Sequence, residues 1–351
     1  MAASLVLLVA CSPEETPGID RVRLEPVARL AAGMDTLFPD IPTGVARSAD
    51  GRYFVATGDG FFPQLVQVFD PNGRWLRAIG RPGSGPGEYR RASDVLPKGD
   101  SLLILDGTAR RLTTLNAALE VAHAEQMPTW FSSPRLMPDG SLIGAVTRRG
   151  GDSSVVVFER WSPGSASTVQ WTEPGSCDRN CWQYTKAFNT DATNGVWAID
   201  RLFRYRLHRY DSLGAVLRSW DLTADWYVPY DSVNMTSPQH PPAPYIVGTW
   251  IDSAGRIWIT AIASDAEWHE GLGPQRRGEG GRMYYPTDDW GLTYDGVIEV
   301  RDTTDGALLA AGRFDQPVLM PVVGAPGLVG RFIDDADGWW RLEILRANLQ
   351  N

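Results

Sequence analysis

The chain has 351 residues and 43% apolar content, enough to bury the core of one large all-β domain or of two ordinary domains. Charged residues make up only 21%, whereas Gly (36), Pro (25) and Trp (14) are abundant, which favours many short strands joined by turns over long helices. The net charge of −9 and the lack of any Lys/Arg cluster argue against a nucleic-acid partner, whose binding depends on neutralising phosphates.

At the N-terminus, an apolar run over residues 5–10 ends at Cys11 and passes into a polar segment that contains proline. The run is too short to cross a bilayer, which takes about 20 apolar residues. The sequence LVAC at 8–11 resembles the lipobox of a bacterial lipoprotein, which implies a signal over 1–11 with lipidated Cys11, then a tether over 12–19. No Lys or Arg precedes the run, so an apolar terminus with a buried thiol is the alternative. We expect a protein held by lipid on the periplasmic side of a bacterial membrane.

The glycine-rich stretch VFDPNGRWLRAIGRPGSGPGEYRR occupies residues 68–91. Closely spaced glycines are typical of phosphate-binding loops, but such a loop ends in Gly-Lys-Ser/Thr and opens a helix. Here Glu88 and Tyr89 follow, and the apolar residues beyond are too sparse for a helix. The stretch instead predicts two strands joined by a turn at 71–73 and a loop to the next unit of a repeat.

Five segments share one plan, in which a strand, a tight turn ending in glycine and a second apolar strand follow each other. They span 46–58, 95–107, 136–148, 189–201 and 250–262, and their turn glycines Gly51, Gly99, Gly140, Gly195 and Gly255 recur every 41 to 60 residues. A period of this length with about four strands per unit predicts the blades of a β-propeller.

The two ends of the chain supply the remaining strands. Residues 328–347 offer two strands and residues 20–32 offer one, and mixing them in one blade closes the ring without leaving an open sheet edge. We predict an all-β protein, a six-bladed β-propeller closed by N- and C-terminal strands, with one domain over 20–347. Seven blades are the alternative.

The junction FDPNGRWLRAIGRPGSGPGEYRRASDV at 69–95, the following DSLLILDG and the LVAC motif are similar to the NHL-like six-bladed β-propellers found as bacterial lipoproteins. The later crossovers lack the GPGE pattern. The resemblance implies the fold, while the group is functionally diverse.

Cys177 and Cys181 in GSCDRNCW are close enough to pair, and an exported protein lies in an oxidising compartment. A metal site there would need two further ligands, which the neighbouring sequence does not supply. We therefore expect a disulfide.

Some six-bladed propellers are hydrolases that hold calcium over the central channel with Glu, Asn and Asp. Asp106 and Asp200 end corresponding strands of two units, and we expect two carboxylates that cap strand ends, with a calcium site as the alternative. No nucleophile–base pair is visible. A periplasmic metal-dependent hydrolase of the lactonase-like type is thus the alternative function.

Two long loops carry the main functional hypothesis: a proline-rich crossover at 223–245 and an insertion at 264–296. The strand count puts both on one side of the disc. Aromatic and Arg side chains are enriched at protein interfaces, so we expect partner contacts from Trp226, Tyr227, Trp268, Arg276, Arg277, Tyr284, Tyr285 and Trp290. The expected function is a non-catalytic, membrane-tethered scaffold without a cofactor that binds a membrane-associated protein, for example as an extrinsic subunit of a respiratory or photosynthetic complex.

Overall fold

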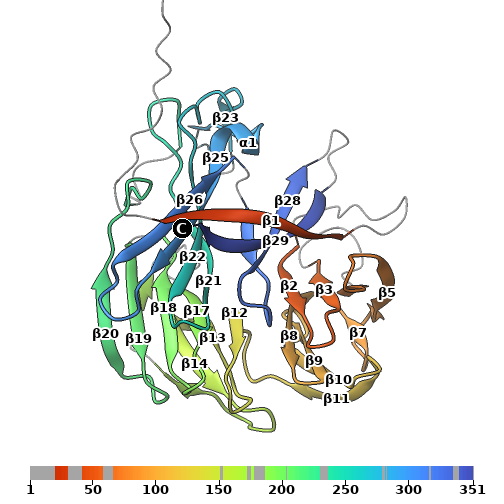
Figure 1. Cartoon of the computed structure of the whole chain (residues 1–351). Helices are drawn as coiled ribbons and strands as arrows, with labels where there is room; N and C mark the ends of the chain where they lie inside the picture. Colours follow the sequence, from red (N-terminus) through yellow and green to blue (C-terminus); the bar gives the residue numbers. More distant parts are fainter. Residues whose placement is uncertain are drawn as a thin grey trace, which may run out of the picture.

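The computed structural model describes residues 20–30, 42–57, 66–150, 153–171, 175–177, 186–202, 204–229, 236–278, 281, 283–315, 318–334 and 340–350. In these residues the strands form six antiparallel blades around a ring (Figure 1). The predicted six-bladed β-propeller is confirmed, and the alternative of seven blades is wrong.

Each blade runs from an innermost to an outermost strand. The first blade is β2 (Gly44–Arg47), β3 (Tyr53–Ala56), β4 (Val66–Phe69) and β5 (Trp75–Ile79); the second is β8 (Ala92–Lys98), β9 (Ser101–Asp106), β10 (Arg111–Leu115) and β11 (Val121–Gln126). The third is β12 (Ser132–Leu136), β13 (Leu142–Gly150) and β14 (Ser153–Trp161), with β15 (Val169–Gln170) and β16 (Gly175–Cys177) both paired to β14. The fourth is β17 (Lys186–Thr190), β18 (Val196–Asp200), β19 (Arg206–Tyr210) and β20 (Val216–Asp221).

The last two blades are joined in one sheet. The fifth is β21 (Tyr245–Ile251), β22 (Ile257–Ser264), β25 (Tyr294–Arg301) and β26 (Leu308–Phe314); the sixth is β27 (Leu319–Pro321), β28 (Leu328–Asp334), β29 (Trp340–Gln350) and β1 (Asp20–Leu30). Short elements lie in the loops, namely β6 (Arg81–Pro82), β7 (Glu88–Tyr89), β23 (Arg276–Arg277), β24 (Met283–Tyr284) and the helix α1 (Trp290–Thr293). Among the described residues no helix has the length and apolar character needed to span a membrane.

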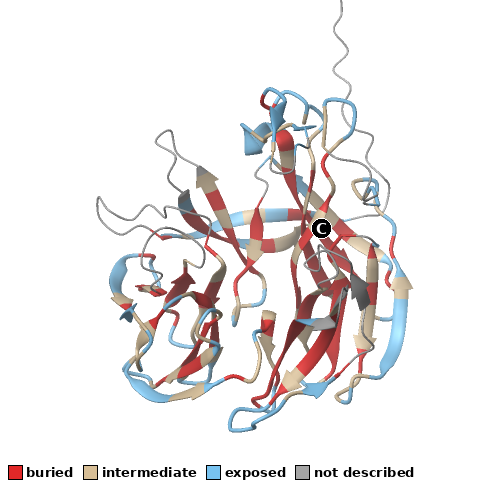
Figure 2. Ribbon diagram, turned by 180° about the vertical axis from the view of Figure 1, so that it is seen from behind, coloured by how far each residue is buried: buried red, intermediate tan, exposed pale blue. Residues whose placement is uncertain are grey.

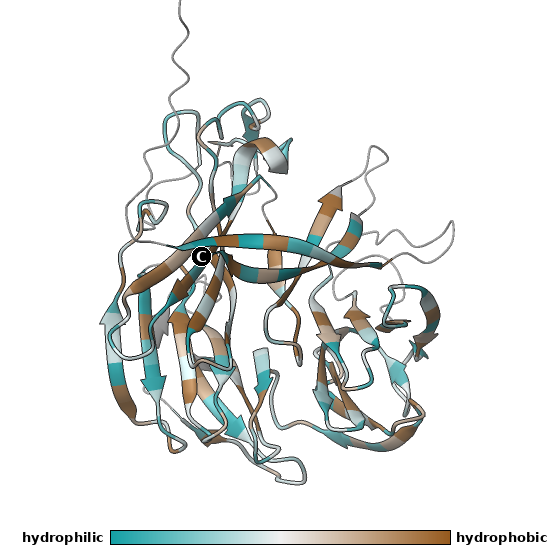
Figure 3. Ribbon diagram, viewed as in Figure 1, coloured by the Kyte–Doolittle hydropathy of each residue, from teal (hydrophilic) through white to brown (hydrophobic). Residues whose placement is uncertain are grey.

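The N-terminal strand closes the ring. β1 pairs antiparallel with β29 from Arg21 to Leu30, and its first residues also pair in parallel with β26 of the fifth blade. Hydrophilic and hydrophobic residues alternate along β1 (Figure 3), and Val22 and Leu30 are buried by the ring. On the inner side, Val323 beyond β27 exchanges two backbone hydrogen bonds of 2.8 Å with the β2 strand. The sixth blade is thus joined to the first blade at the inner edge and to the fifth blade, through β1, at the outer edge.

Tight turns at glycine positions join the strands. Between β4 and β5, Gly73 has a φ of 87° and its amide donates to Asp70 O at 3.0 Å. A Cβ at this position would lie 2.2 Å from Arg29 O of β1, so only glycine permits the close approach. In the fourth blade Asn194 takes the left-handed position with a φ of 60°, and the glycine expected there, Gly195, follows it.

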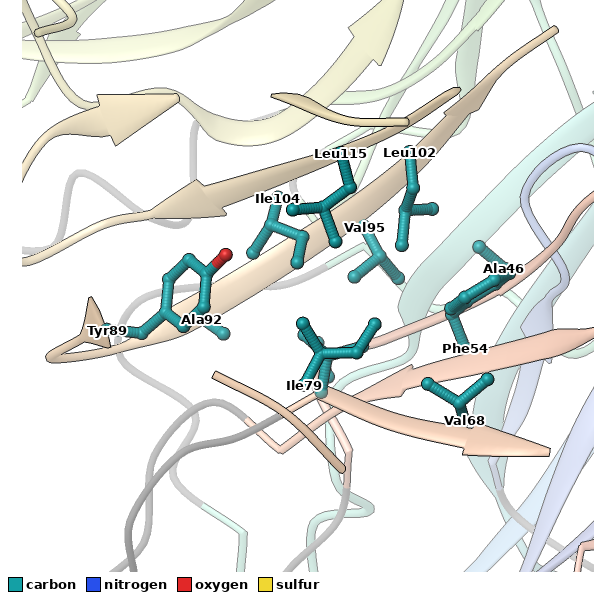
Figure 4. Packing of buried hydrophobic residues seen from close by; sticks show 12 residues of the cluster. Ala46, Phe54, Val68, Ile79, Tyr89, Ala92, Val95, Leu102, Ile104 and Leu115 are labelled. Carbon is teal, nitrogen blue, oxygen red and sulfur yellow. The ribbon is translucent and has the colours of Figure 1, made fainter. Parts of the chain in front are cut away.

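The hydrophobic core consists of clusters of buried side chains between neighbouring blades, all the way round the ring. Figure 4 shows one of them, in which Phe54 and Ile79 of the first blade pack with Val95 and Ile104 of the second. Second strands such as β3, β9 and β18 are nearly continuous buried apolar runs because a neighbouring blade covers each face. The outer strands β5, β11 and β20 are largely exposed (Figure 2).

Candidate functional site

The two ends of the ring carry different loops. Because the strands are antiparallel, turns between first and second strands and between third and fourth strands lie at one end of the ring. Loops between second and third strands and the crossovers lie at the other end. The first end carries five-residue turns such as 48–52 and 70–74. The other end, here called the loop face, carries the crossover at 222–244 and the insertion at 265–293 (Figure 1). Trp268 Nε1 of the insertion donates to Ser237 O of the crossover at 3.3 Å, so the two loops touch.

The crossover is pinned to the blades by its aromatic side chains. Trp226 Nε1 donates to Glu299 Oε1 at 2.7 Å, and Tyr227 OH donates to Leu202 O at 2.6 Å. Both rings pack on Tyr205, each with a centroid distance of 5.1 Å. Trp226 and Tyr227 are therefore half-buried groups that hold the crossover in place, and a contact of either with a partner stays a prediction.

Glu299 is the centre of a buried polar network below the crossover. Only 2% of its surface is exposed, and it accepts from Arg301 Nε at 2.7 Å as well as from Trp226 and Tyr205. Burial and the Glu299 carboxylate raise the pKa of Tyr205 well above its ordinary value, so its hydroxyl remains a donor. Arg301 in turn donates to Thr223 O at 2.7 Å, which fixes the start of the crossover.

The insertion is a folded unit with its own hydrogen bonds. β23 pairs with β24, and Leu272 bridges Thr287. Asp289 caps α1 by accepting from Leu292 N at 3.0 Å, and Thr293 Oγ1 donates to Asp289 O at 2.6 Å. The described backbone of the insertion is therefore held by its own hydrogen bonds, while many of its described side chains face solvent.

Exposed apolar side chains gather on this unit. Met283, Tyr284, Trp290 and Leu292 are between 38% and 47% exposed. The exposed Arg276 and Arg277 on β23 pair with Tyr284 and Met283 of β24. We call these six residues the insertion patch. Of the predicted partner residues, Trp268 and Tyr285 are half-buried and lie outside it. The sequence interpretation missed Met283 and Leu292, because it considered only aromatic and Arg residues.

The glycine-rich crossover folds around the carboxylate of its own Glu88. The Glu88 carboxylate accepts from Ser84 N at 3.0 Å and from Gly85 N at 2.8 Å, and it pairs with Arg81 at 2.8 Å. These amide hydrogen bonds and Arg81 hold the pKa of Glu88 below its ordinary value. The amides that a phosphate would require are thus already used, in agreement with the prediction that this is a connecting loop.

Asp106 and Asp200 are each engaged by protein groups. Asp106 is fully buried and accepts from Arg90 N at 2.6 Å and from Ala109 N at 2.8 Å, so it caps the end of β9. Asp200 forms an ion pair with Lys186 and lies 3.5 Å from His208 Nε2. No cluster of three or more His, Cys, Asp or Glu side chains suited to a metal occurs in the described part of the chain. The donors that surround the two carboxylates account for both of them without calcium.

The predicted lipidation and disulfide fall largely outside the described residues. Cys11 and Cys181 are not among them, and Cys177 is described only as the last residue of β16, where it pairs with Ser154. Both modifications stay predictions.

A cavity of about 290 Å³ lies inside the ring of innermost strands and is lined by all six blades. Val45, Val95, Val318 and Met320 contribute an apolar wall. Asp94, Ser133, Arg135, Arg201 and Tyr245 contribute the polar groups. The lining includes the starts of β2 and β21 and the residue after β18, all of which lie toward the loop face by strand direction.

Two guanidinium groups from neighbouring blades, those of Arg135 and Arg201, line this cavity. Arg201 is only 6% exposed; it donates to Tyr245 OH at 2.7 Å, to Ile246 O at 2.8 Å and to Ser133 Oγ at 3.0 Å. Burial lowers the pKa of Arg135 to about 10 against the effect of Asp94, and burial raises the pKa of Asp94 to about 6 against the effect of Arg135. At neutral pH the three groups together leave the cavity with net positive charge. The sequence pattern gave no signal for this cluster.

Comparison with known proteins places the chain in the class of six-bladed propellers. Residues 44–143 match the model of the DUF5128 family, which is described as a 6-bladed beta-propeller. A solved member of the DUF4221 family from Bacteroides vulgatus has a TM-score of 0.58 at 10% identity, with 95% of this chain and 99% of that chain covered. A solved protein described as exported, from Bacteroides fragilis, has a TM-score of 0.57 at 11% identity, with 94% and 96% covered.

None of the curated proteins compared with this chain matches it. At identities this low the similarity establishes the fold alone. The resemblance to NHL-like lipoproteins beyond the propeller fold stays a prediction.

Proposed function

We propose that this protein is a non-catalytic β-propeller that binds a partner protein through the insertion patch. The observation that supports this function is the exposure of Met283, Tyr284, Trp290 and Leu292 on a backbone held by its own hydrogen bonds. Several exposed apolar side chains on one insertion are typical of an interaction site, and Trp, Tyr and Arg are the residues that dominate binding energy in interfaces.

The patch also indicates the chemistry of the partner. Arg276 and Arg277 are exposed at its edge, and the nearest paired carboxylate, Asp288, lies 3.9 Å from Arg276 Nη2. An apolar surface rimmed by Asp or Glu would complement these side chains, because Arg binds carboxylates through a planar pair of donors.

The proposed setting is the periplasmic side of a bacterial membrane, with the chain anchored by lipid at Cys11. The likeness to a protein described as exported and the LVAC motif support this setting. The partner is then a membrane protein, and one concrete form is an extrinsic subunit of a respiratory or photosynthetic complex. Intact mass of the detergent-extracted protein tests the anchor, because a chain that starts at an unmodified Met1 would contradict it.

The alternative, a metal-dependent hydrolase, finds less support. Asp106 and Asp200 are occupied by backbone amides and by Lys186, and the central cavity contains Arg135 and Arg201, whose charges repel a cation. We therefore prefer the binding function.

Site-specific photo-crosslinking tests the partner surface. Tyr284 is replaced by p-benzoylphenylalanine, and Trp75 of β5, which is 44% exposed on another blade, receives the same replacement as a matched control. We expect irradiation of membranes from the native host to give a discrete crosslinked product from position 284 that is absent at position 75. Equal products at both positions, or none at 284, would contradict the proposal.

A further inference from the structure

The central cavity holds positive charge that the protein itself does not fully neutralise. Arg135 and Arg201 reach it from β12 and from the end of β18, whereas Asp94 is the single carboxylate among the described lining residues. Burying charge without a counter-charge is costly. A site with two guanidinium groups and one carboxylate therefore favours a second, external anion.

Several N–H donors of Arg135 have no hydrogen-bond partner in the described part of the chain. Its Nη1 donates to Pro134 O at 2.8 Å, and within the described part of the chain it forms no further hydrogen bond or ion pair. Arg201 Nε is fully buried and has no hydrogen-bond partner. Neither Nε nor Nη2 of Arg135 is buried without a partner in this way. The free N–H groups of Arg135 therefore face the cavity, in the paired geometry that binds a carboxylate through both oxygens.

The remaining lining restricts the size and polarity of the ligand. A volume of about 290 Å³ holds roughly ten water-sized groups. The side formed by Val45, Val95, Val318 and Met320 offers no polar side-chain group, so it suits a hydrocarbon chain. The lining thus offers both the charged and the apolar groups that a short amphipathic acid requires.

We infer that the central channel is a binding site for a small aliphatic carboxylate, with the carboxylate held by Arg135 near Arg201 and the hydrocarbon chain against the valines and Met320. This site is distinct from the insertion patch and does not depend on it. The channel geometry distinguishes the ligand class from inorganic phosphate, which has no apolar part for the valine wall.

The test uses the full chain labelled with ¹³C at methionine methyl groups. Met320 lines the cavity and Met283 lies exposed on the insertion, so the two methyl resonances report on the proposed site and on an internal control. Hexanoate, butyrate and inorganic phosphate are titrated at constant ionic strength, and the Met320 resonance is assigned with Met320→Leu. We expect hexanoate to shift Met320 saturably and to leave Met283 unchanged, with butyrate weaker.

Two variants with opposite expected effects complete the experiment. Arg135→Gln should weaken hexanoate binding at least tenfold, and Asp94→Asn should strengthen it several-fold at neutral pH because a competing negative charge is removed. Arg74→Gln, an exposed arginine on the first blade, is the matched control and should bind as the parent does. A Met320 resonance that does not respond to hexanoate, phosphate binding as tight as hexanoate, or an Asp94→Asn variant that binds more weakly would overturn the inference. If Arg135→Gln does not fold, the response of Met320 to hexanoate and phosphate in the unaltered chain still tests the inference.

Discussion

Single side chains explain two features that the sequence left open. Glu88 folds back onto the amides of its own loop, so the glycines of GRPGSGPGE serve the approach of an internal carboxylate; a Cβ at Gly83 would lie 2.2 Å from Glu88 Oε2. Asp94 has the opposite environment, since burial inside the ring raises its pKa to about 6 even though guanidinium groups lie near. The ionised carboxylate is thus stabilised at Glu88 and destabilised at Asp94.

The raised pKa of Asp94 predicts a pH dependence of stability. The unfolded chain should titrate near the ordinary value of 3.8 and the folded chain at about 6, so between these values the folded state binds more protons. The free energy of unfolding should therefore fall as pH rises through this window, by about 2 kcal/mol. Arg91, Arg135 and Arg201 are the charged groups around Asp94. The pKa of Arg135 is lowered only to about 10, so this group stays protonated throughout the window.

Urea denaturation at about pH 4 and about pH 6, near the two ends of this window, checks the expectation. Asp94→Asn should remove this part of the pH dependence and be the more stable protein at the higher pH. A difference between parent and variant that is the same at both pH values would contradict the assignment.

At the scale of elements, the two long loops have different tasks. The crossover turns its aromatic side chains inward, where Trp226 and Tyr227 pack on Tyr205 above the buried pair Glu299–Arg301. The insertion folds on itself and keeps Tyr284 and Trp290 exposed. The crossover is therefore a support for the loop face, and the insertion is the part available to a partner.

Glu299→Gln should destabilise the protein by about 3 kcal/mol, because the substitution leaves the buried Arg301 charge without its carboxylate. Trp226 and Tyr205 would also lose a charged acceptor. Chemical denaturation measures the loss, and Glu270→Gln on the exposed insertion is the matched control that should change stability little. If both variants unfold at the same denaturant concentration, the network does not anchor the crossover.

At the scale of the whole molecule, stability depends on closing the ring. β1 covers the outer edge of β29 and also reaches β26, and its Val22 and Leu30 belong to the cores on either side of the sixth blade. Without this strand the sixth blade would expose an unpaired edge and parts of two cores.

Removal of residues 1–30 should lower the midpoint of thermal unfolding by at least about 10 °C, since the apolar burial of Val22 and Leu30 alone contributes several kcal/mol. A shorter truncation that begins at Asp20 retains β1 and serves as the control. Circular dichroism during heating compares the two, and equal midpoints would show that the ring does not need its N-terminal strand.

Local patterns were sufficient to predict the blades, their turns, the closing strand and the positions of both long loops. Turn glycines and apolar strands act through near neighbours in the chain, so their spacing carries the repeat directly. The closing strand was predictable because residues 20–32 had no other partner in the repeat pattern. The lipid anchor and the disulfide also came from short motifs, and they stay predictions.

Tertiary structure alone decided which aromatic side chains stay exposed and what the centre of the ring contains. Trp226 and Trp290 both lie in long loops. Trp226 donates a hydrogen bond to the buried Glu299, whereas Trp290 is 41% exposed. Arg135 and Arg201 belong to different blades and share the cavity with Asp94 only because the ring closes. The physical reason is that local sequence sets the strands, whereas exposure and charge at the axis depend on groups that meet across the closed ring.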